Sequence, residues 1–244
     1  MSGLEGVEVL AREVAALGVE TGLPFIAASA DIGSPKPMLG VDGRPLAESL
    51  FRWIDPELQY WRDSGFALRA PFVFATRFTA EPFYFQNGQL ATWRDAAWTR
   101  TLGAIEQADS FGVGAAIIAP AYLPRGVIGA VVWATPDAAT DVRSIFTARA
   151  GQFHALALKL TGAYQDLDLK SAGEQARLTR REIQCLKWAA AGKTDGEIGS
   201  IVHIATPTVR FHIVNAAGKL GVAGRSQAVH RAATLGYIGA VPAA

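Results

Sequence analysis

Four side chains near the C-terminus, Arg210, Phe211, Val214 and Asn215, have types and spacing suited to reading DNA bases. Arginine pairs bidentately with guanine, asparagine pairs with adenine, and apolar side chains pack on thymine methyl groups. Helical spacing places Phe211, Val214 and Asn215 on one side, with Arg210 beside them. The segment therefore predicts a helix that enters the major groove of duplex DNA.

The surrounding elements are two short helices separated by a tight turn. Thr194 and Glu197 form a capping box, in which the hydroxyl and the carboxylate each accept a backbone N–H at a helix start. Twelve residues later, Thr206 and Pro207 predict a second start with Thr206 as the N-cap. Two such helices predict a helix-turn-helix. The apolar side of the second helix is expected at Val209, Ile213, Ala216 and Leu220.

Charge also favours a polyanionic partner for this part of the chain. From Lys170 onward there are ten Lys/Arg and four Asp/Glu, whereas the first 169 residues hold 13 basic and 18 acidic side chains. A solvated basic surface on an ordinary helical bundle is the competing interpretation. Thr208 and Lys219 flank the base-reading side. Phosphate contacts, which position a protein without specifying sequence, are expected from Lys193, Thr206 and Arg225.

Aromatic residues divide the chain in the same place as charge. Five of the six Trp and eleven of the twelve Phe precede residue 170. The polar segment before Thr179 and Glu182, which form another capping box, has the composition of a linker. Cys185, the only cysteine, is expected in a helical core. We expect a sensor domain over residues 1–165, a linker over 166–177 and a DNA-binding domain over 178–244.

The pattern of the first domain is helices bracketing a strand-rich middle. The fold class expected is α+β, an N-terminal α/β/α sandwich with an antiparallel sheet, followed by an all-α domain of four helices. Apolar periodicity and turn residues predict helices over residues 4–20, 95–112 and 137–164, a helix opening at Asp55 and Pro56 and running through Trp61, and strands over 24–29, 113–120 and 126–135.

The run "LTRREIQCLKWAAAGKTDGEIGSIVHIATPTVRFHIVNAAGKLGVAGRSQAV" resembles the LuxR-type helix-turn-helix domain. The matching elements are "LTxRE", "GKT", "EI", "TV", "H", "KLGV" and "R-Q-AV". Gly199 departs from the usual Ala, and Ala205 stands where a Ser normally caps the recognition helix. In members that sense acyl-homoserine lactones, two positions four apart contact bases. The resemblance assigns them to Arg210 and Val214, so one polar reader is absent.

The first domain resembles the autoinducer-binding domain of quorum-sensing regulators. "FGVGAAIIAPAYLPRGVIGAVVWAT" is similar to that family's strand pair, with Gly114, Pro120 and Gly126 in matching places. A phosphorylated receiver domain is not expected, because its acidic pair, phospho-accepting Asp and Lys do not occur in order. The resemblance implies a domain that binds a small hydrophobic signal, such as an acyl-homoserine lactone.

The expected ligand site departs from the family. Members carry a Trp, a Tyr four residues later and an Asp-Pro nine residues beyond, and the best register places Glu57, Trp61 and Ala70 there. Ala70 cannot accept the amide proton of an acyl-homoserine lactone, and an unpaired buried N–H costs about 1–3 kcal/mol. A different register stays open. The expected ligand-binding residues are Trp61, Ala70, Phe72, Phe74 and Phe85.

Together these features predict a homodimeric, cytoplasmic transcription regulator controlled by a small hydrophobic signal. Its partners would be operator DNA and the signal, with RNA polymerase as a further candidate, and no membrane, cofactor or metal is expected. An enzyme is not expected, because His154 is the only histidine before residue 200 and no nucleophile–His–acid set accompanies it. The alternative is a ligand-independent regulator whose first domain serves only dimerisation or protein interaction.

Overall fold

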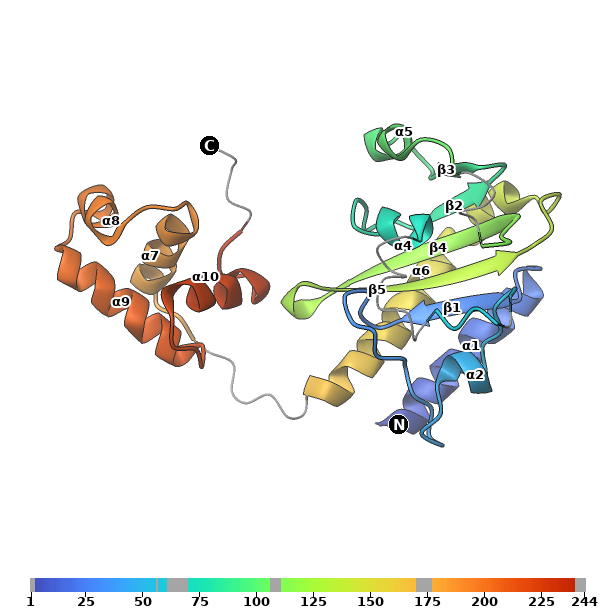
Figure 1. Cartoon of the computed structure of the whole chain (residues 1–244), viewed down its shortest axis with the longest axis horizontal. Coiled ribbons are helices and arrows are strands. Elements are labelled where there is room, and N and C mark those ends of the chain that lie inside the picture. Colours follow the sequence, from blue (N-terminus) through green and yellow to red (C-terminus); the bar gives the residue numbers. More distant parts are fainter. Residues whose placement is uncertain (1–2, 56, 61–69, 106–110, 170–176, 240–244) are drawn as a thin grey trace. The chain divides into compact units, whose positions relative to one another are not determined.

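The computed structural model describes residues 3–55, 57–60, 70–105, 111–169 and 177–239. Contacts divide the chain into two compact units, and the described residues 177–239 belong to the second. The first unit contains helices α1 (Leu4–Glu20), α2 (Leu46–Ser49), α4 (Pro71–Ala75), α5 (Ala97–Leu102) and α6 (Val142–Leu169), with strands β1 (Phe25–Ser29), β2 (Phe83–Gln86), β3 (Gln89–Ala91), β4 (Ala115–Leu123) and β5 (Val127–Thr135) (Figure 1). The second contains α7 (Arg180–Ala190), α8 (Asp195–Val202), α9 (Thr206–Lys219) and α10 (Arg225–Thr234).

A five-stranded sheet in the order β1-β5-β4-β2-β3 forms the middle of the first unit, and every neighbouring pair is antiparallel. The two long strands pair from Ala115 opposite Thr135 to Leu123 opposite Val127. Pro120 is tolerated inside β4 because the pairing of β4 with β2 ends at Ile118, so its missing N–H leaves no ladder bond unmade on that side. The predicted antiparallel sheet is confirmed.

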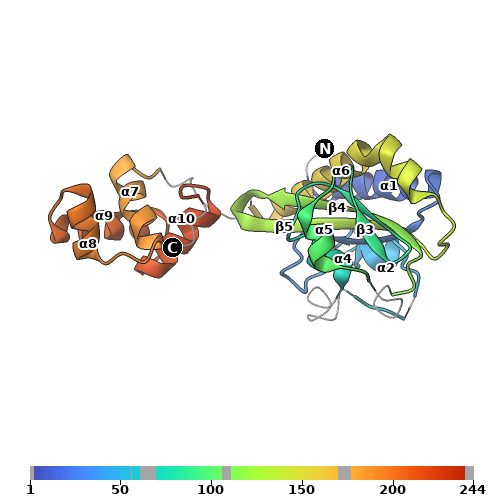
Figure 2. The same ribbon diagram turned by 90° about the horizontal axis from the view of Figure 1, so that it is seen from above.

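Helices α1 and α6 lie on one side of this sheet, and the short helices α4 and α5 lie on the other (Figure 2). On one face, α1 and α6 pack against alternate residues of β4 and β5, among them Ile117 and Trp133. The Trp133 indole Nε1 donates to the Val14 carbonyl of α1 at 2.9 Å. The other face carries a second core, here called the aromatic cluster. Its buried members are Phe72, Ala75, Phe83, Phe85, Leu90, Ile105, Val113, Ala116, Ile118, Val132 and Ala134. The α/β/α sandwich is therefore confirmed.

The hairpin of β2 and β3 was not predicted, although the sequence contains its signal. Asn87 and Gly88 connect the strands with φ of 52° and 76°. A two-residue hairpin turn needs positive φ at both positions, and Asn-Gly is the preferred pair for it. The dense aromatic content of this region favoured an interpretation as core filling, which masked the alternation in "FYFQ".

Three predicted boundaries in the first unit were wrong. Residues 57–60 form turn and irregular structure, so no helix opens at Asp55, and the rest of that predicted helix, including Trp61, lies outside the described residues. The helix predicted over 95–112 ends at Leu102, because Gly103 adopts φ 68°. Helix α6 continues to Leu169, so the first residues of the predicted linker are helical.

The second unit has the four predicted helices around one core. Both capping boxes form, at Thr179 with Glu182 and at Thr194 with Glu197. Cys185 is fully buried, as predicted. The core is made by Cys185, Leu186, Ile198, Val202, Val209, Ile213, Ala216, Ala217, Leu220, Ala228, Ala232 and Ile238. On α10, Ala228 and Ala232 face inward, and Ala233 is exposed.

The turn between α8 and α9 corrects one prediction and explains one departure from the family. The N-cap of α9 is Ala205, which has no capping side chain, and Thr206 is the first helical residue. At Gly199 an added Cβ would lie 2.7 Å from the Ile204 carbonyl oxygen. Because this oxygen belongs to the backbone of a tight turn and cannot move aside like a flexible side chain, the usual Ala does not fit here without a shift.

Candidate DNA-binding surface and ligand-binding site

Helix α9 buries one side and presents the opposite side to solvent. Val209 is fully buried and Ile213 is 5% exposed, whereas Phe211 and Val214 are each 61% exposed. The Arg210 side chain is 74% exposed. Two large apolar side chains kept at the surface beside a guanidinium make a face suited to a partner with both apolar and polar edges. A base pair in the major groove has such edges.

The other predicted base-side and phosphate-side residues fall into two groups. Thr206 and Thr208 are exposed in the first turn of α9, and Asn215 and Lys193 are half-buried. Lys219 and Arg225, by contrast, are both held in ion pairs within the unit. The first group is available to a partner as it stands. The second has a structural role whatever it does with DNA.

Lys219 is paired with the most deeply buried carboxylate of the described chain. Its Nζ donates to both carboxylate oxygens of Glu182, at 2.8 and 2.9 Å, and the Glu182 side chain is only 4% exposed. Burial raises the pKa of Glu182, but the hydrogen bonds from Lys219 and from Thr179 outweigh it and hold that pKa below its ordinary value. The pair therefore ties the end of α9 to the start of α7.

Asp195, in the first turn of α8, lies between two guanidinium groups. Arg225 donates through Nη1 to Asp195 Oδ1 and through Nη2 to the Lys193 carbonyl oxygen. On the other side, Arg210 Nε lies 3.4 Å from Asp195 Oδ2. Asp195 was not among the predicted site residues. The position of Asp195 in the sequence gave no signal, because its pairing with Arg210 and Arg225 depends on the packing of α8, α9 and α10.

The predicted ligand-binding residues do not all come together. Phe72 and Phe85 are buried in the aromatic cluster with ring centroids 5.1 Å apart, and Ala70 is buried immediately before α4. Phe74 is 40% exposed and stacks edge-on against the exposed ring of Phe78, because it lies on the outer side of the short helix. Phe74 is therefore placed apart from the cluster. Trp61 lies outside the described residues.

Two indole groups that were not predicted as site residues pack against the aromatic cluster. Trp53 and Trp98 are partly buried side chains whose Nε1 atoms are inaccessible to solvent and have no hydrogen-bond partner among the described residues. An unpaired buried donor costs about 1–3 kcal/mol. Such groups are uncommon in folded proteins and mark places where a partner can bind. In the sequence, Trp53 and Trp98 lie on either side of the predicted ligand-binding residues, which span positions 61–85, and local spacing gave no signal that their N–H groups would be unpaired.

Tyr60, which packs edge-on to Trp53, differs from these indoles because its polar atom is paired. Its hydroxyl oxygen accepts from the backbone N–H of Ala28 at 3.2 Å. Burial raises the pKa of Tyr60 to about 12. The phenol therefore stays neutral and covers the outer edge of β1.

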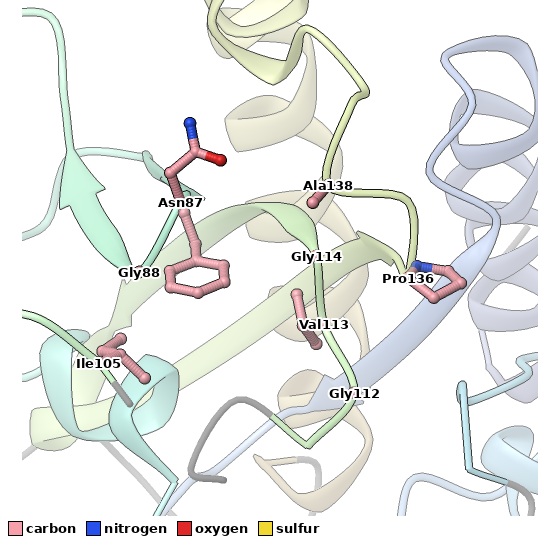
Figure 3. A pocket seen from close by; sticks show the side chains of 9 residues that line it. Asn87, Gly88, Ile105, Gly112, Val113, Gly114, Pro136 and Ala138 are labelled. Atoms are coloured by element: carbon pink, nitrogen blue, oxygen red, sulfur yellow. The ribbon is translucent and has the colours of Figure 1, made fainter. Parts of the chain in front are cut away.

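A pocket of about 310 Å³ opens beside the aromatic cluster (Figure 3). Phe85, Ile105 and Val113 supply its apolar wall, and Asn87 supplies an amide from the β2–β3 turn. A volume of this size suits a small ligand. The remaining lining residues are Gly88, Gly112, Gly114, Pro136 and Ala138.

The architecture defines a class of protein, a sandwich domain with a ligand-sized pocket joined to a helix-turn-helix unit. Two family models match the chain: the autoinducer binding domain over residues 39–163, and the bacterial regulatory proteins of the luxR family over residues 176–232. The chain belongs to the LuxR-type regulators with an autoinducer-binding domain. This family consists of transcription regulators and not of enzymes, as the sequence predicted.

Two relatives, both transcriptional activators, agree with this assignment. The chain is 34% identical over 182 residues to the transcriptional activator protein VanR of Vibrio anguillarum, which covers 74% of this chain and 72% of the relative. It is 28% identical to the transcriptional activator protein PhzR of Pseudomonas fluorescens, over 74% of this chain and 71% of the relative. The crystal structure of Escherichia coli SdiA matches 75% of this chain and 74% of its own, with a TM-score of 0.43 and 22% identity. Within the described part of the chain, no helix combines the length and apolar character needed to cross a membrane.

Proposed function

We propose that this regulator reads operator DNA through the exposed face of α9, with Arg210 on base edges and Phe211 and Val214 against thymine methyl groups. The exposure of both apolar side chains, 61% each, on a helix whose other side is buried is the observation that carries the proposal. Thr206, Thr208, Asn215 and Lys193 flank this face, and the unit has an excess of basic residues. Lys219 and Arg225 contribute to DNA affinity mainly by fixing α9 and α10.

The aromatic side of the sheet is the proposed site for a small hydrophobic signal. The ligand would carry acceptor oxygens for the Trp53 and Trp98 Nε1 groups, because each indole lacks an acceptor among the described residues. Ala70 supplies no acceptor for an amide proton. The polar side chains of the first unit that are fully buried among the described residues are threonines, at positions 76, 79, 135 and 161, so no fully buried described carboxylate replaces it there. A ligand that needs no N–H acceptor fits this chemistry best.

A homodimer is the proposed working form, because two recognition helices read two half-sites. The candidates for subunit contact are α6, which carries Leu158 at 45% exposure, and α10, which ends beside the partly exposed Leu235. RNA polymerase is a proposed further partner. A cytoplasmic location is proposed as well, because the proposed DNA target of the regulator lies there.

The DNA proposal is tested by titration of the full-length protein. A duplex is first enriched from a random-sequence library by the wild-type protein, and a scrambled duplex of equal composition serves as the comparison. Arg210→Ala should weaken binding to the selected duplex by about 1–3 kcal/mol and leave the scrambled duplex within about 0.5 kcal/mol. Equal losses on both duplexes would contradict a base contact by Arg210.

The ligand proposal is tested by thermal unfolding in the presence of matched compounds. An acyl-homoserine lactone and the ester analogue with oxygen in place of the amide nitrogen differ in one N–H. The ester should raise the unfolding temperature at least as much as the amide, because no described carboxylate can accept the amide proton. A clear preference for the amide would contradict this. If neither compound acts and mass spectrometry finds no co-purifying small molecule, the ligand-independent alternative gains support.

A further inference from the structure

Resting on the proposed DNA contact of α9, we propose that Asp195 is a positioning residue that sets sequence discrimination by holding Arg210. The observation is a carboxylate shared between two guanidinium groups with unequal contacts. Arg225 is held tightly through Asp195 Oδ1 and the Lys193 carbonyl oxygen. Arg210 is held loosely through Oδ2, at 3.4 Å.

The unequal contacts give Asp195 two different roles. The Asp195 side chain is only 19% exposed, and its contact with Arg225, whose side chain is 35% exposed, anchors it to α10. The contact with Arg210 is at the long end of the hydrogen-bond range and involves a side chain that is 74% exposed. Asp195 is therefore the fixed partner, and it orients Arg210, whose side chain stays exposed for contact with DNA.

This geometry restricts where the Arg210 guanidinium can go. The contact with Asp195 uses Nε, and the two terminal nitrogens of Arg210 have no hydrogen bond among the described residues, so they stay available for bidentate contact with a guanine edge. The carboxylate also offsets the charge of Arg210, which lowers its attraction to phosphates of any sequence. Both effects favour a base contact over a backbone contact and so raise discrimination between DNA sequences.

Asp195→Asn removes the charge with little change in shape. On the scrambled duplex, the variant should bind a few-fold more tightly, and the slope of log affinity against log salt should steepen by about 0.9 for one added phosphate contact. On the selected duplex, the preference for the base pair that Arg210 reads should fall about fivefold or more, measured with duplexes substituted at each position.

Glu197→Gln is the matched control, because it removes the same charge from the same turn of α8. Glu197 accepts from Thr194 and forms no ion pair with an arginine among the described residues, and glutamine preserves the capping box. This variant should change the affinity for all duplexes by the same factor and leave the base preference intact.

The dependence on Arg210 separates positioning from a general structural effect. In an Arg210→Ala background, Asp195→Asn should no longer alter the base preference, because a residue that acts through another has no effect once that residue is gone. The proposal is overturned if Asp195→Asn leaves the preference unchanged, or if it causes the same loss in the Arg210→Ala background. Failure of the wild-type protein to enrich any sequence would instead overturn the proposed DNA contact itself, and this inference with it.

Discussion

In the helix-turn-helix unit the buried Glu182 carboxylate has several hydrogen-bond partners, while large apolar side chains remain on the surface of α9. The aromatic side of the sandwich shows the reverse, since its apolar side chains are buried and two indole N–H groups inside it have no described acceptor. Groups that lack a partner thus lie on the surface of the helix-turn-helix unit and in the interior of the sandwich. That difference indicates a macromolecular partner for the first and an enclosed small molecule for the second.

The largest expected effect separates the two sides of the helix-turn-helix. Ile198→Ala should lower the free energy of unfolding of the second unit by about 2–5 kcal/mol, because Ile198 is fully buried and its truncation leaves a cavity. Val214→Ala, on the exposed side, should change it by less than about 0.5 kcal/mol. Hydrogen exchange measured by mass spectrometry on peptides from α8 and α9 reports each value. Similar losses for both variants would mean that Val214 is part of a core.

The next effect concerns the buried ion pair. Glu182→Ala removes the capping carboxylate and the partner of Lys219, and should cost about 2 kcal/mol at neutral pH. The pKa of Glu182 is lower in the folded state than its ordinary value of 4.5. Its contribution is therefore complete above that value and is lost as the pH falls through the folded pKa. In that acidic window, the free energy of unfolding measured with urea should fall more for the wild type than for the variant. Parallel pH profiles of the two proteins would contradict the assignment.

The smallest effect sharpens the contrast between paired and unpaired indoles. Trp98→Phe removes a buried donor that has no described acceptor, so stability should change by no more than about 1 kcal/mol, in either direction. Trp133→Phe is the control, because it removes the bond to the Val14 carbonyl from a fully buried site and should cost clearly more. Thermal unfolding of the ligand-free protein measures both. An equally large loss for Trp98→Phe would show that its indole N–H is paired after all.

The second unit could be predicted almost entirely from sequence, because its signals are local. Each capping box spans four residues, and the buried side of α9 repeats at helical spacing. The N-cap of α9 was misplaced by one residue, since Thr206 and Ala205 are adjacent and only the turn geometry decides between them. The ion pairs of Asp195 and Lys219 join residues on different helices, so the local spacing of residues could not predict them.

The candidate ligand-binding side of the first unit was less predictable because it is assembled from distant segments. Phe72, Phe85 and Val113 meet only after β2 pairs with β4 and α4 packs over them. The outward direction of Phe74 follows from the short helix that carries it, which aromatic content alone did not reveal. The end of α5 at Gly103 likewise depends on a backbone conformation that periodicity missed.

The most direct test of the exposed face of α9 uses chemical labelling of a single thiol. Cys185, the only native cysteine, is fully buried, so Val214→Cys adds one accessible thiol to the proposed base-reading side. Val19→Cys, at a 72% exposed position of α1, is the control. Both variants should react rapidly with a maleimide in the absence of DNA, and saturating selected duplex should protect only Val214→Cys. Equal reactivity of Val214→Cys with and without the bound duplex would contradict the entry of this face into the groove.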